Sequence, residues 1–156
     1  SSDLFKSEKG ANIIEKGTQE IPKNISSVII IELNSADSLA LIALPGIGPS
    51  FAKRIMKYRE MLGGFCRKEQ LMEVFGLSAE TYSKIESRVS VNPSTVKQID
   101  LNKDEFKVIN RHPYLTYEHT KEICNRSRTL PITSEVLKDI LKDDALFEKL
   151  KPYVKY

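Results

Sequence analysis

The chain has 156 residues, 40% of them hydrophobic, and 24 basic against 21 acidic side chains give it a formal net charge of +3. This length suits one ordinary domain or two small ones, and the apolar content excludes a wholly disordered protein. The small net charge excludes a large field that would hold a polyanion non-specifically, so any contact with nucleic acid has to be local.

The sequence contains no pattern typical of a metal site, a disulfide framework or an enzyme active site. Its two cysteines, Cys66 and Cys124, do not have metal-site spacing, and its two histidines, His112 and His119, lack a cysteine or acidic partner at ligand-like spacing. No paired carboxylates and no nucleophile with its base stand out. We therefore expect no metal, no cofactor, no small-molecule substrate and no catalytic residue.

Residues 1–27 are predicted to form a flexible polar leader, because they are rich in charge and contain Gly10, Gly17 and Pro22. No run of 18 apolar residues and no secretory signal pattern is present. Because the chain begins with Ser1 rather than Met, we expect a fragment whose leader or anchor lies outside it.

The first folded unit is expected to open with an extended segment and a short helix. Residues 28–31 form a β-branched run that reads as a strand, but no second strong strand is found to pair with it, so we expect it to pack on helices. Asn34 and Asp37 resemble a capping box, which predicts a helix that begins near Ser35.

Residues 44–55, with the sequence LPGIGPSFAKRI, are predicted to form a tight hairpin between two helices. Gly46 and Gly48 stand where the chain must reverse, and only glycine enters positive φ without steric cost. Pro49 suits the first position of the second helix, where its missing N–H is no loss. That helix is expected to run to about Leu62 and to end at the two glycines that follow.

This hairpin predicts an anion site, because a glycine turn before a helix presents unpaired N–H groups and the positive end of the helix dipole. Without side chains at Gly46 and Gly48, a phosphate oxygen can approach the backbone closely. Lys53, one turn into the helix, adds a point charge, and Arg54 is placed to reach a neighbouring phosphate. The ligand that fits best is a nucleic-acid phosphate.

After the hairpin, short helices joined by turns are expected. One begins near Lys68 and is broken by Gly76, and Ser78 caps another that carries Tyr82, Ile85 and Val89. Residues 92–98, which include Asn92-Pro93-Ser94, are predicted to be a linker.

The chain then repeats itself at a constant offset of 68 positions. Ile99-Asp100-Leu101-Asn102 matches Ile31-Glu32-Leu33-Asn34, Pro113 matches Pro45, Lys121 matches Lys53 and Ile123 matches Ile55. The sequence therefore predicts an all-α fold of two tandem units of short helices, at residues 28–91 and 99–156.

The second hairpin differs from the first at the positions that would bind the anion. Tyr114 stands opposite Gly46, Thr116 opposite Gly48, Glu118 opposite Ser50, and Glu122 opposite Arg54. A non-glycine residue at positive φ costs about 1 kcal/mol or more, so the second turn either takes another path or carries strain. We infer a degenerate hairpin that keeps the scaffold and has lost the anion site, although Arg111, Lys121, Arg126 and Arg128 leave a weaker side-chain contact with DNA open.

Residues 31–89 resemble the helix-hairpin-helix repeat of bacterial DNA-uptake competence proteins of the ComEA type. The resemblance rests on ELNSAD (32–37), LPGIG (44–48), Ala52, Ile55, Tyr58-Arg59, Gly64-Phe65, Glu69, Leu71 and Val74 to Gly76. It implies an all-helical fold that binds double-stranded DNA through the sugar-phosphate backbone without sequence preference, and a place at the outer face of the membrane, with the anchor absent from this fragment.

Carried over by position, the resemblance implies phosphate contacts at the backbone of Gly46, Gly48 and Ser50, with Lys53 beside them and Ile47 pointing inward. From the residues themselves we add Arg54 and Lys57 to this candidate site. We expect Arg59 to pack and cap within the repeat.

The alternative is a helical protein-interaction scaffold without DNA binding, in which a partner protein docks on the second repeat. The same architecture is similar to the extrinsic subunit U of photosystem II, where it serves protein assembly, and fold alone does not settle function. The acidic second hairpin and its tyrosines, Tyr114 and Tyr117, which this hypothesis takes to be exposed, favour it.

Overall fold

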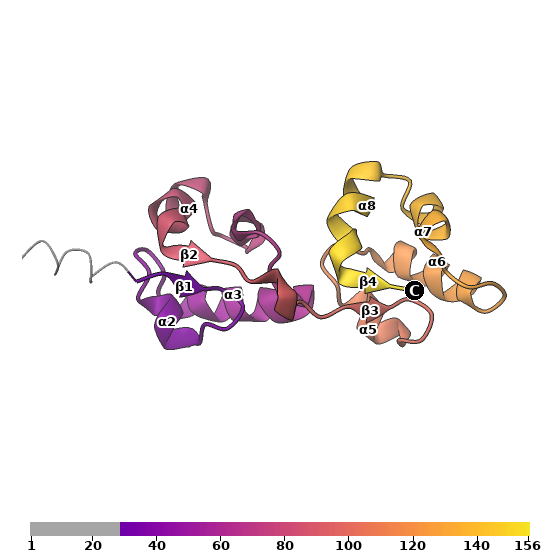
Figure 1. Cartoon of the computed structure of the whole chain (residues 1–156), viewed down its shortest axis with the longest axis horizontal. Coiled ribbons are helices and arrows are strands. Elements are labelled where there is room, and N and C mark those ends of the chain that lie inside the picture. The colour runs from indigo at the N-terminus through magenta and orange to yellow at the C-terminus, as the bar shows by residue number, and fades with distance from the viewer. Residues whose placement is uncertain (1–28) are drawn as a thin grey trace, which may run out of the picture. The chain divides into compact units, whose positions relative to one another are not determined.

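The computed structural model describes residues 29–156, of which the stretch from Ile31 to Tyr156 forms one compact unit. Two groups of short helices follow one another along this stretch, and each group is closed by a two-residue parallel strand pair (Figure 1). The predicted all-α fold of two tandem helix-hairpin-helix repeats is confirmed. The predicted leader, residues 1–27, lies outside the described residues, and the repeat and linker boundaries stay predictions.

The two repeats place their elements in the same order. The first contains β1 (Ile31–Glu32), α2 (Ser38–Ile42), α3 (Pro49–Leu62), the 3-10 helix η3 (Lys68–Glu73), α4 (Ala79–Ile85), η4 (Glu86–Arg88) and β2 (Val89–Ser90). After η5 (Pro93–Thr95), the second contains β3 (Ile99–Asp100), α5 (Phe106–Asn110), α6 (Tyr117–Ser127), α7 (Ser134–Leu141), α8 (Asp144–Leu150), η6 (Lys151–Tyr153) and β4 (Val154–Lys155).

The strand at the start of the first repeat has a partner, so the expectation of an unpaired segment is wrong. Ile31 lies opposite Val89 in a parallel pair, and in the second repeat Ile99 lies opposite Val154 in the same way. Val89 therefore belongs to β2 and not to the helix that was predicted to carry it. Two-residue strands are too short to show the alternating pattern by which strands are found in a sequence.

The first helix begins three residues later than predicted, because Asp37 itself is the N-cap. Its carboxylate accepts the N–H of Ala40 at 2.9 Å, and the helix starts at Ser38. Asn34 is not part of a capping box: its amide donates to the carbonyl of Phe65 at 2.9 Å and accepts the N–H of Phe65 at 2.7 Å. Asn102 clasps Ile132 with the same pair of bonds in the second repeat.

Other local signals are confirmed. α3 ends at Leu62, and Gly63 follows in the left-handed conformation with φ of 97°. Ser78 caps α4 by accepting the N–H of Thr81. The guanidinium of Arg59 donates to two backbone carbonyls near the start of the repeat, at 2.8 Å each, and so packs within the repeat as expected.

A buried polar cluster joins the second repeat to the first. The Gln70 amide, only 3% exposed, donates to the hydroxyls of Tyr114 at 2.8 Å and Tyr153 at 3.0 Å. Tyr153 donates in turn to the carbonyl of Gly64 at 2.7 Å, and Tyr114 donates to the carboxylate of Glu73 at 2.8 Å. Because Gln70, Tyr114 and Tyr153 each find a hydrogen-bond partner, this cluster avoids the cost of unpaired groups and fixes how these elements meet.

Candidate nucleic-acid interface

The first hairpin turns at Gly46, whose φ of 83° lies in the left-handed region that glycine adopts without strain. The N–H of Ile47 donates to the carbonyl of Leu44 at 3.1 Å, and the Ile47 side chain is buried beneath the turn. Ile47 therefore holds the hairpin from inside, and only its backbone belongs to the surface.

Gly48 does not have a positive φ, so that part of the expectation is wrong. Its φ is −95°, and it is the N-cap residue of α3. A Cβ added there would meet nothing within 4 Å in the described structure, which leaves open space over the backbone. The backbone at this position can therefore be approached closely by a ligand atom.

The N-terminus of α3 carries unpaired donors. Gly48 provides no side-chain cap, and the first backbone N–H of α3 that finds an acceptor is that of Ala52, which donates to the carbonyl of Gly48 at 2.9 Å. In the described part of the chain, the N–H groups of Gly48, Ser50 and Phe51 have no acceptor. Three open donors at the positive end of a 14-residue helix form a site suited to an anion.

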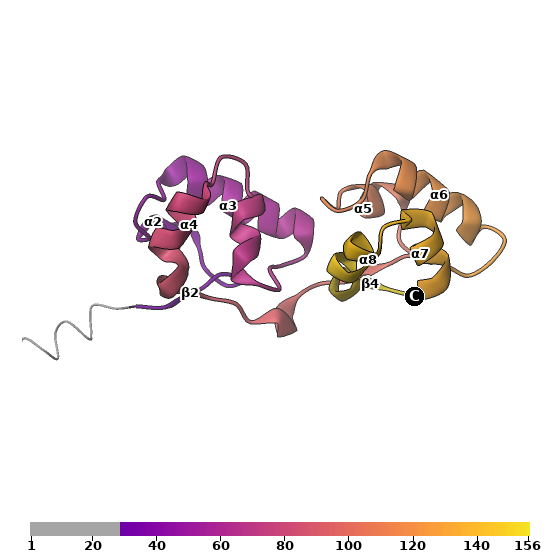
Figure 2. The same ribbon diagram turned by 90° about the horizontal axis from the view of Figure 1, so that it is seen from above.

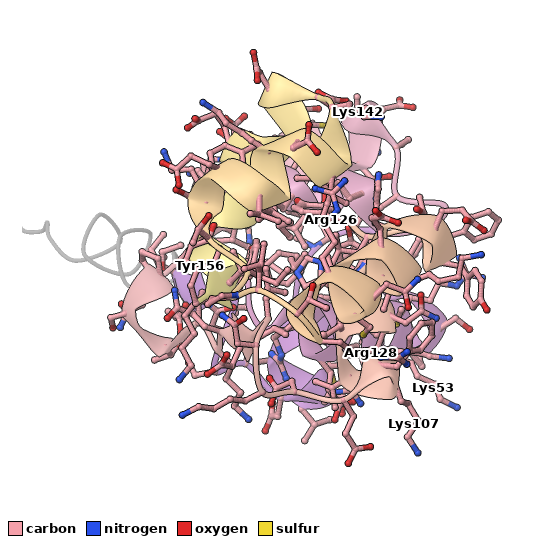
Figure 3. The ribbon with its side chains drawn as sticks, turned by 90° about the vertical axis from the view of Figure 1, so that its right-hand side faces the viewer. Lys53, Lys107, Arg126, Arg128, Lys142 and Tyr156 are labelled. Atoms are coloured by element: carbon pink, nitrogen blue, oxygen red, sulfur yellow. The ribbon has the colours of Figure 1, made fainter. Side chains whose placement is uncertain are left out.

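The three predicted basic side chains take different positions along α3. Lys53 is exposed one turn into α3, and Figure 3 shows its side chain extending outward from the ribbon. Arg54 is held by its neighbours: its guanidinium donates to the carbonyl of Phe75 at 3.2 Å. Lys57 lies one further turn along and lines an open cavity of about 670 Å³ beside Gly63 and Gly64, so it belongs to the far half of the helix.

Sequence reasoning missed a second turn that the fold places against the first. Gly76 has φ of 85°, and the N–H of Leu77 donates to the carbonyl of Val74 at 3.0 Å, which repeats the geometry at Gly46. α4 lies over the N-terminal half of α3 (Figure 2), and a Cβ at Gly46 would lie 3.5 Å from the Thr81 methyl group of α4. The signal was present, since the apolar-x-glycine-apolar pattern of residues 44–47 recurs at residues 74–77.

The second hairpin is closed by an equivalent turn bond, and three of its N–H groups find side-chain acceptors. The N–H of Leu115 donates to the carbonyl of His112 at 3.1 Å, as Ile47 does to Leu44. Here, however, the Tyr114 N–H donates to His112 Nδ1 at 3.1 Å. Thr116 and His119 form a reciprocal capping box, with the Thr116 N–H on His119 Nδ1 at 3.2 Å and the His119 N–H on Thr116 Oγ1 at 3.0 Å.

No strain accompanies the loss of glycine in this turn. Within residues 29–156 the non-glycine residue with positive φ is Lys142, which ends α7. The second turn therefore takes a path that avoids the left-handed region at Tyr114. Thr116, which replaces Gly48, supplies the hydroxyl that caps α6.

Tyr114 is buried at 9% exposure, so its predicted exposure is wrong, whereas Tyr117 is exposed at 57%. Tyr114 was misjudged because its partners in the first repeat are about 40 residues away in the sequence. Burial, followed by the hydrogen bond to Glu73, raises the pKa of the Tyr114 phenol above its usual value. The phenol therefore stays protonated and donates to that carboxylate.

Two of the cations that remain near the second hairpin are paired with acids. Lys121 lies 3.5 Å from Glu118, and Arg126 bonds Glu122 at 2.9 Å and Asp139 at 2.8 Å. Arg111 and Arg128 are exposed. This local balance of charge weakens the field that a phosphate would meet there.

Comparison with known proteins identifies the class to which the first repeat belongs. Residues 26–90 match the helix-hairpin-helix motif family. The chain is 34% identical over 62 residues to ComE operon protein 1 of Bacillus subtilis, which covers 40% of this chain and 30% of that protein. The first repeat is thus a helix-hairpin-helix repeat of the ComEA type, and it is the part of the chain that matches.

Two further relatives match a similar length of chain. An uncharacterized protein of Haemophilus influenzae is 35% identical over 71 residues, which covers 46% of this chain and 62% of that protein. The endonuclease/exonuclease/phosphatase family domain-containing protein 1 of Homo sapiens is 30% identical over 73 residues, which covers 44% of this chain and 13% of that protein. The chain thus spans less than two thirds of each of these relatives, and no solved structure matches it.

Proposed function

We propose that this chain binds double-stranded DNA without sequence preference through its first hairpin. The observation that carries the proposal is the set of open N–H groups at Gly48, Ser50 and Phe51 beside the exposed Lys53. Backbone donors and a lysine recognise a phosphate and carry no sequence information directly, so the contact positions DNA without reading its bases.

The family supports this proposal, because the chain is similar to ComE operon protein 1 and resembles competence proteins that take up DNA. We propose that the chain acts in DNA uptake, as this similarity suggests. Within residues 29–156 no helix is long and apolar enough to cross a membrane.

We propose that the chain is not an enzyme. The match to the human relative covers 13% of that protein, so its name carries no activity to this chain. In the described residues no group of three or more His, Cys, Asp and Glu side chains could hold a metal ion. The role that the hairpin supports is binding.

A titration of labelled blunt duplex at several salt concentrations tests the proposal. One hairpin should bind with a dissociation constant of roughly 10⁻⁴ to 10⁻⁶ M at physiological salt and more tightly at low salt. Gly48→Glu should abolish binding, because it places a carboxylate in the space over the open donors, and Lys53→Glu should weaken it. Lys121→Glu is the matched control, since it makes the same charge change at the equivalent position of the second hairpin. Absence of binding at low salt, or unchanged binding by both first-hairpin variants, would exclude the DNA proposal.

A second candidate is a protein-interaction scaffold that uses the second repeat. Tyr117 is exposed, and its ring packs edge-on against that of Phe106, with centroids 5.5 Å apart. This exposed aromatic pair is the observation in its favour, because aromatic side chains are enriched at protein interfaces. Loss of a specific protein partner in Tyr117→Ser, combined with no DNA binding at low salt, would favour the scaffold. Tyr114 gives no such support, since it is buried within the chain.

A further inference from the structure

Phe75 presents an aromatic ring to solvent at the edge of the proposed DNA site. Its side chain is 83% exposed, although it stands directly before Gly76 in the second turn of the first repeat. In the second repeat, Leu141 likewise stands directly before a left-handed residue, Lys142, and it is buried. The fold therefore does not require an exposed ring here. Single exposed apolar side chains are common on protein surfaces, so a function for Phe75 has to be argued from its neighbours.

Arg54 fixes this ring beside one of the open donors. The Arg54 guanidinium carbon lies 5.4 Å from the ring centroid of Phe75 and 5.4 Å from that of Phe51. The same guanidinium donates to the Phe75 carbonyl at 3.2 Å. Phe51 supplies an open N–H at the start of α3, and a Cβ at Gly76 would lie 3.5 Å from its ring. A cation between two rings thus lies next to the phosphate-binding backbone.

This arrangement matches the parts of a nucleotide. The open donors suit the phosphate, and the exposed ring with its guanidinium suits the flat face of a base, which stacks on aromatic and guanidinium planes. Inside a duplex each base face is already covered by its neighbours, and even at a blunt end each base is held in its pair, so the ring can freely reach only the face of an unpaired base. A single-stranded extension next to the duplex supplies one.

We propose that Phe75, held by Arg54, is a stacking platform for an unpaired nucleobase, so that the chain prefers duplex DNA with a single-stranded extension over blunt duplex. This inference rests on the proposed function, because it requires that the first hairpin holds a DNA phosphate. Phe75 then sets specificity for strand structure, while the backbone donors of the hairpin supply the contact common to all DNA.

The test compares two labelled duplexes of equal length, one blunt and one with a short single-stranded extension, by fluorescence anisotropy. For the wild type, the extension should tighten binding roughly 5- to 150-fold, the range for stacking of one base on an aromatic ring. Phe75→Ala should lose this gain and keep its affinity for the blunt duplex, and Phe75→Trp should retain the gain. Leu130→Ala is the matched control, because Leu130 is a large exposed side chain of the second repeat.

Each other outcome overturns a stated claim. Equal wild-type affinity for both duplexes, or a full gain retained by Phe75→Ala, would overturn the platform and leave the hairpin proposal standing. No binding of either duplex by the wild type at low salt would overturn the proposed function and the platform with it. A DNA-free dimer that Phe75→Ala dissociates would assign the ring to self-association and also overturn the platform.

Discussion

The two hairpins of this chain are closed by the same kind of turn bond and differ in which of their N–H groups have acceptors. Both turns are closed by a similar bond, from Ile47 to Leu44 at 3.1 Å and from Leu115 to His112 at 3.1 Å. In the first, the donors at Gly46, Gly48 and Phe51 stay open among the described residues; at the three equivalent positions of the second, imidazole nitrogens and a hydroxyl accept them.

The difference shows that helix capping and anion binding compete for the same donors. A side chain that caps a helix N-terminus stabilises the helix and removes the groups that an anion would use. In the second repeat Thr116 caps α6, and Tyr114 of the same hairpin packs on the first repeat. The first repeat keeps an uncapped α3. Substitutions that exchange these features test the comparison directly.

The largest effect is expected from Tyr114→Gly, which gives the second hairpin the residue of the first. The change removes a buried ring together with its bonds to Gln70 and Glu73, and it should destabilise the chain by about 3 to 5 kcal/mol, the range for loss of a large buried aromatic side chain. Urea unfolding measures the loss. Tyr117→Gly is the control, since that ring is exposed. Equal losses in the two variants would show that Tyr114 does not anchor the second repeat.

The next largest effect is a loss of stability at acid pH. His112 Nδ1 accepts the Tyr114 N–H only while the imidazole is neutral. Burial lowers the pKa of His112 to about 4, and Nε2 has no hydrogen-bond partner in the described structure. A base with a lowered pKa in the folded state contributes stability that is present above its unfolded pKa of about 6.5 and is lost as pH falls toward 4, here by about 3 kcal/mol.

Unfolding free energies measured between pH 7 and pH 4 check this expectation. Wild-type stability should fall with pH through this window, and His112→Gln, which cannot titrate, should show a shallower slope. If the two slopes coincide, His112 is not the group that the acid protonates.

The third prediction closes the first hairpin with Gly48→Ser. The φ of −95° and the open space around Gly48 accept a side chain, and the serine hydroxyl can take the Phe51 N–H. The helix should gain a few tenths of a kcal/mol in stability. DNA affinity should fall about 10-fold, because a donor that bonded a charged oxygen is consumed. Thermal unfolding and anisotropy measure the two effects, and a stabilised variant with unchanged affinity would separate capping from binding.

Local signals made much of the first hairpin predictable from the sequence. Glycine after Leu62, proline at the start of α3 and serine before α4 act within a few residues, and each marked its element correctly. The glycines themselves were predictable as a close-approach site, but the prediction gave Gly48 a positive φ that it does not need. Gly48 is an open N-cap because no acceptor in the described structure takes its N–H, and the sequence alone does not show this.

Features that depend on distant residues were not predictable. Asn34 looked like part of a cap because its neighbours fit a capping pattern, but its partner Phe65 is 31 positions away. Tyr114 looked exposed because its own hairpin gives it no cover, and Gln70, 44 positions away, provides that cover. The strand pairs are two residues long and join the ends of each repeat, so they leave almost no local trace.

The smallest effect is expected from opening the second hairpin with Thr116→Gly. The variant frees the His119 N–H and should lose only a few tenths of a kcal/mol, because glycine is a tolerable N-cap. It should gain no measurable DNA affinity, because Tyr114 keeps its N–H on His112 and Glu118 adds an acidic side chain in the first turn of α6. Thermal unfolding and anisotropy at low salt measure both quantities. A gain in affinity would mean that one open N-cap is sufficient for phosphate binding; no gain would mean that binding needs the whole set of open donors and the lysine of the first hairpin.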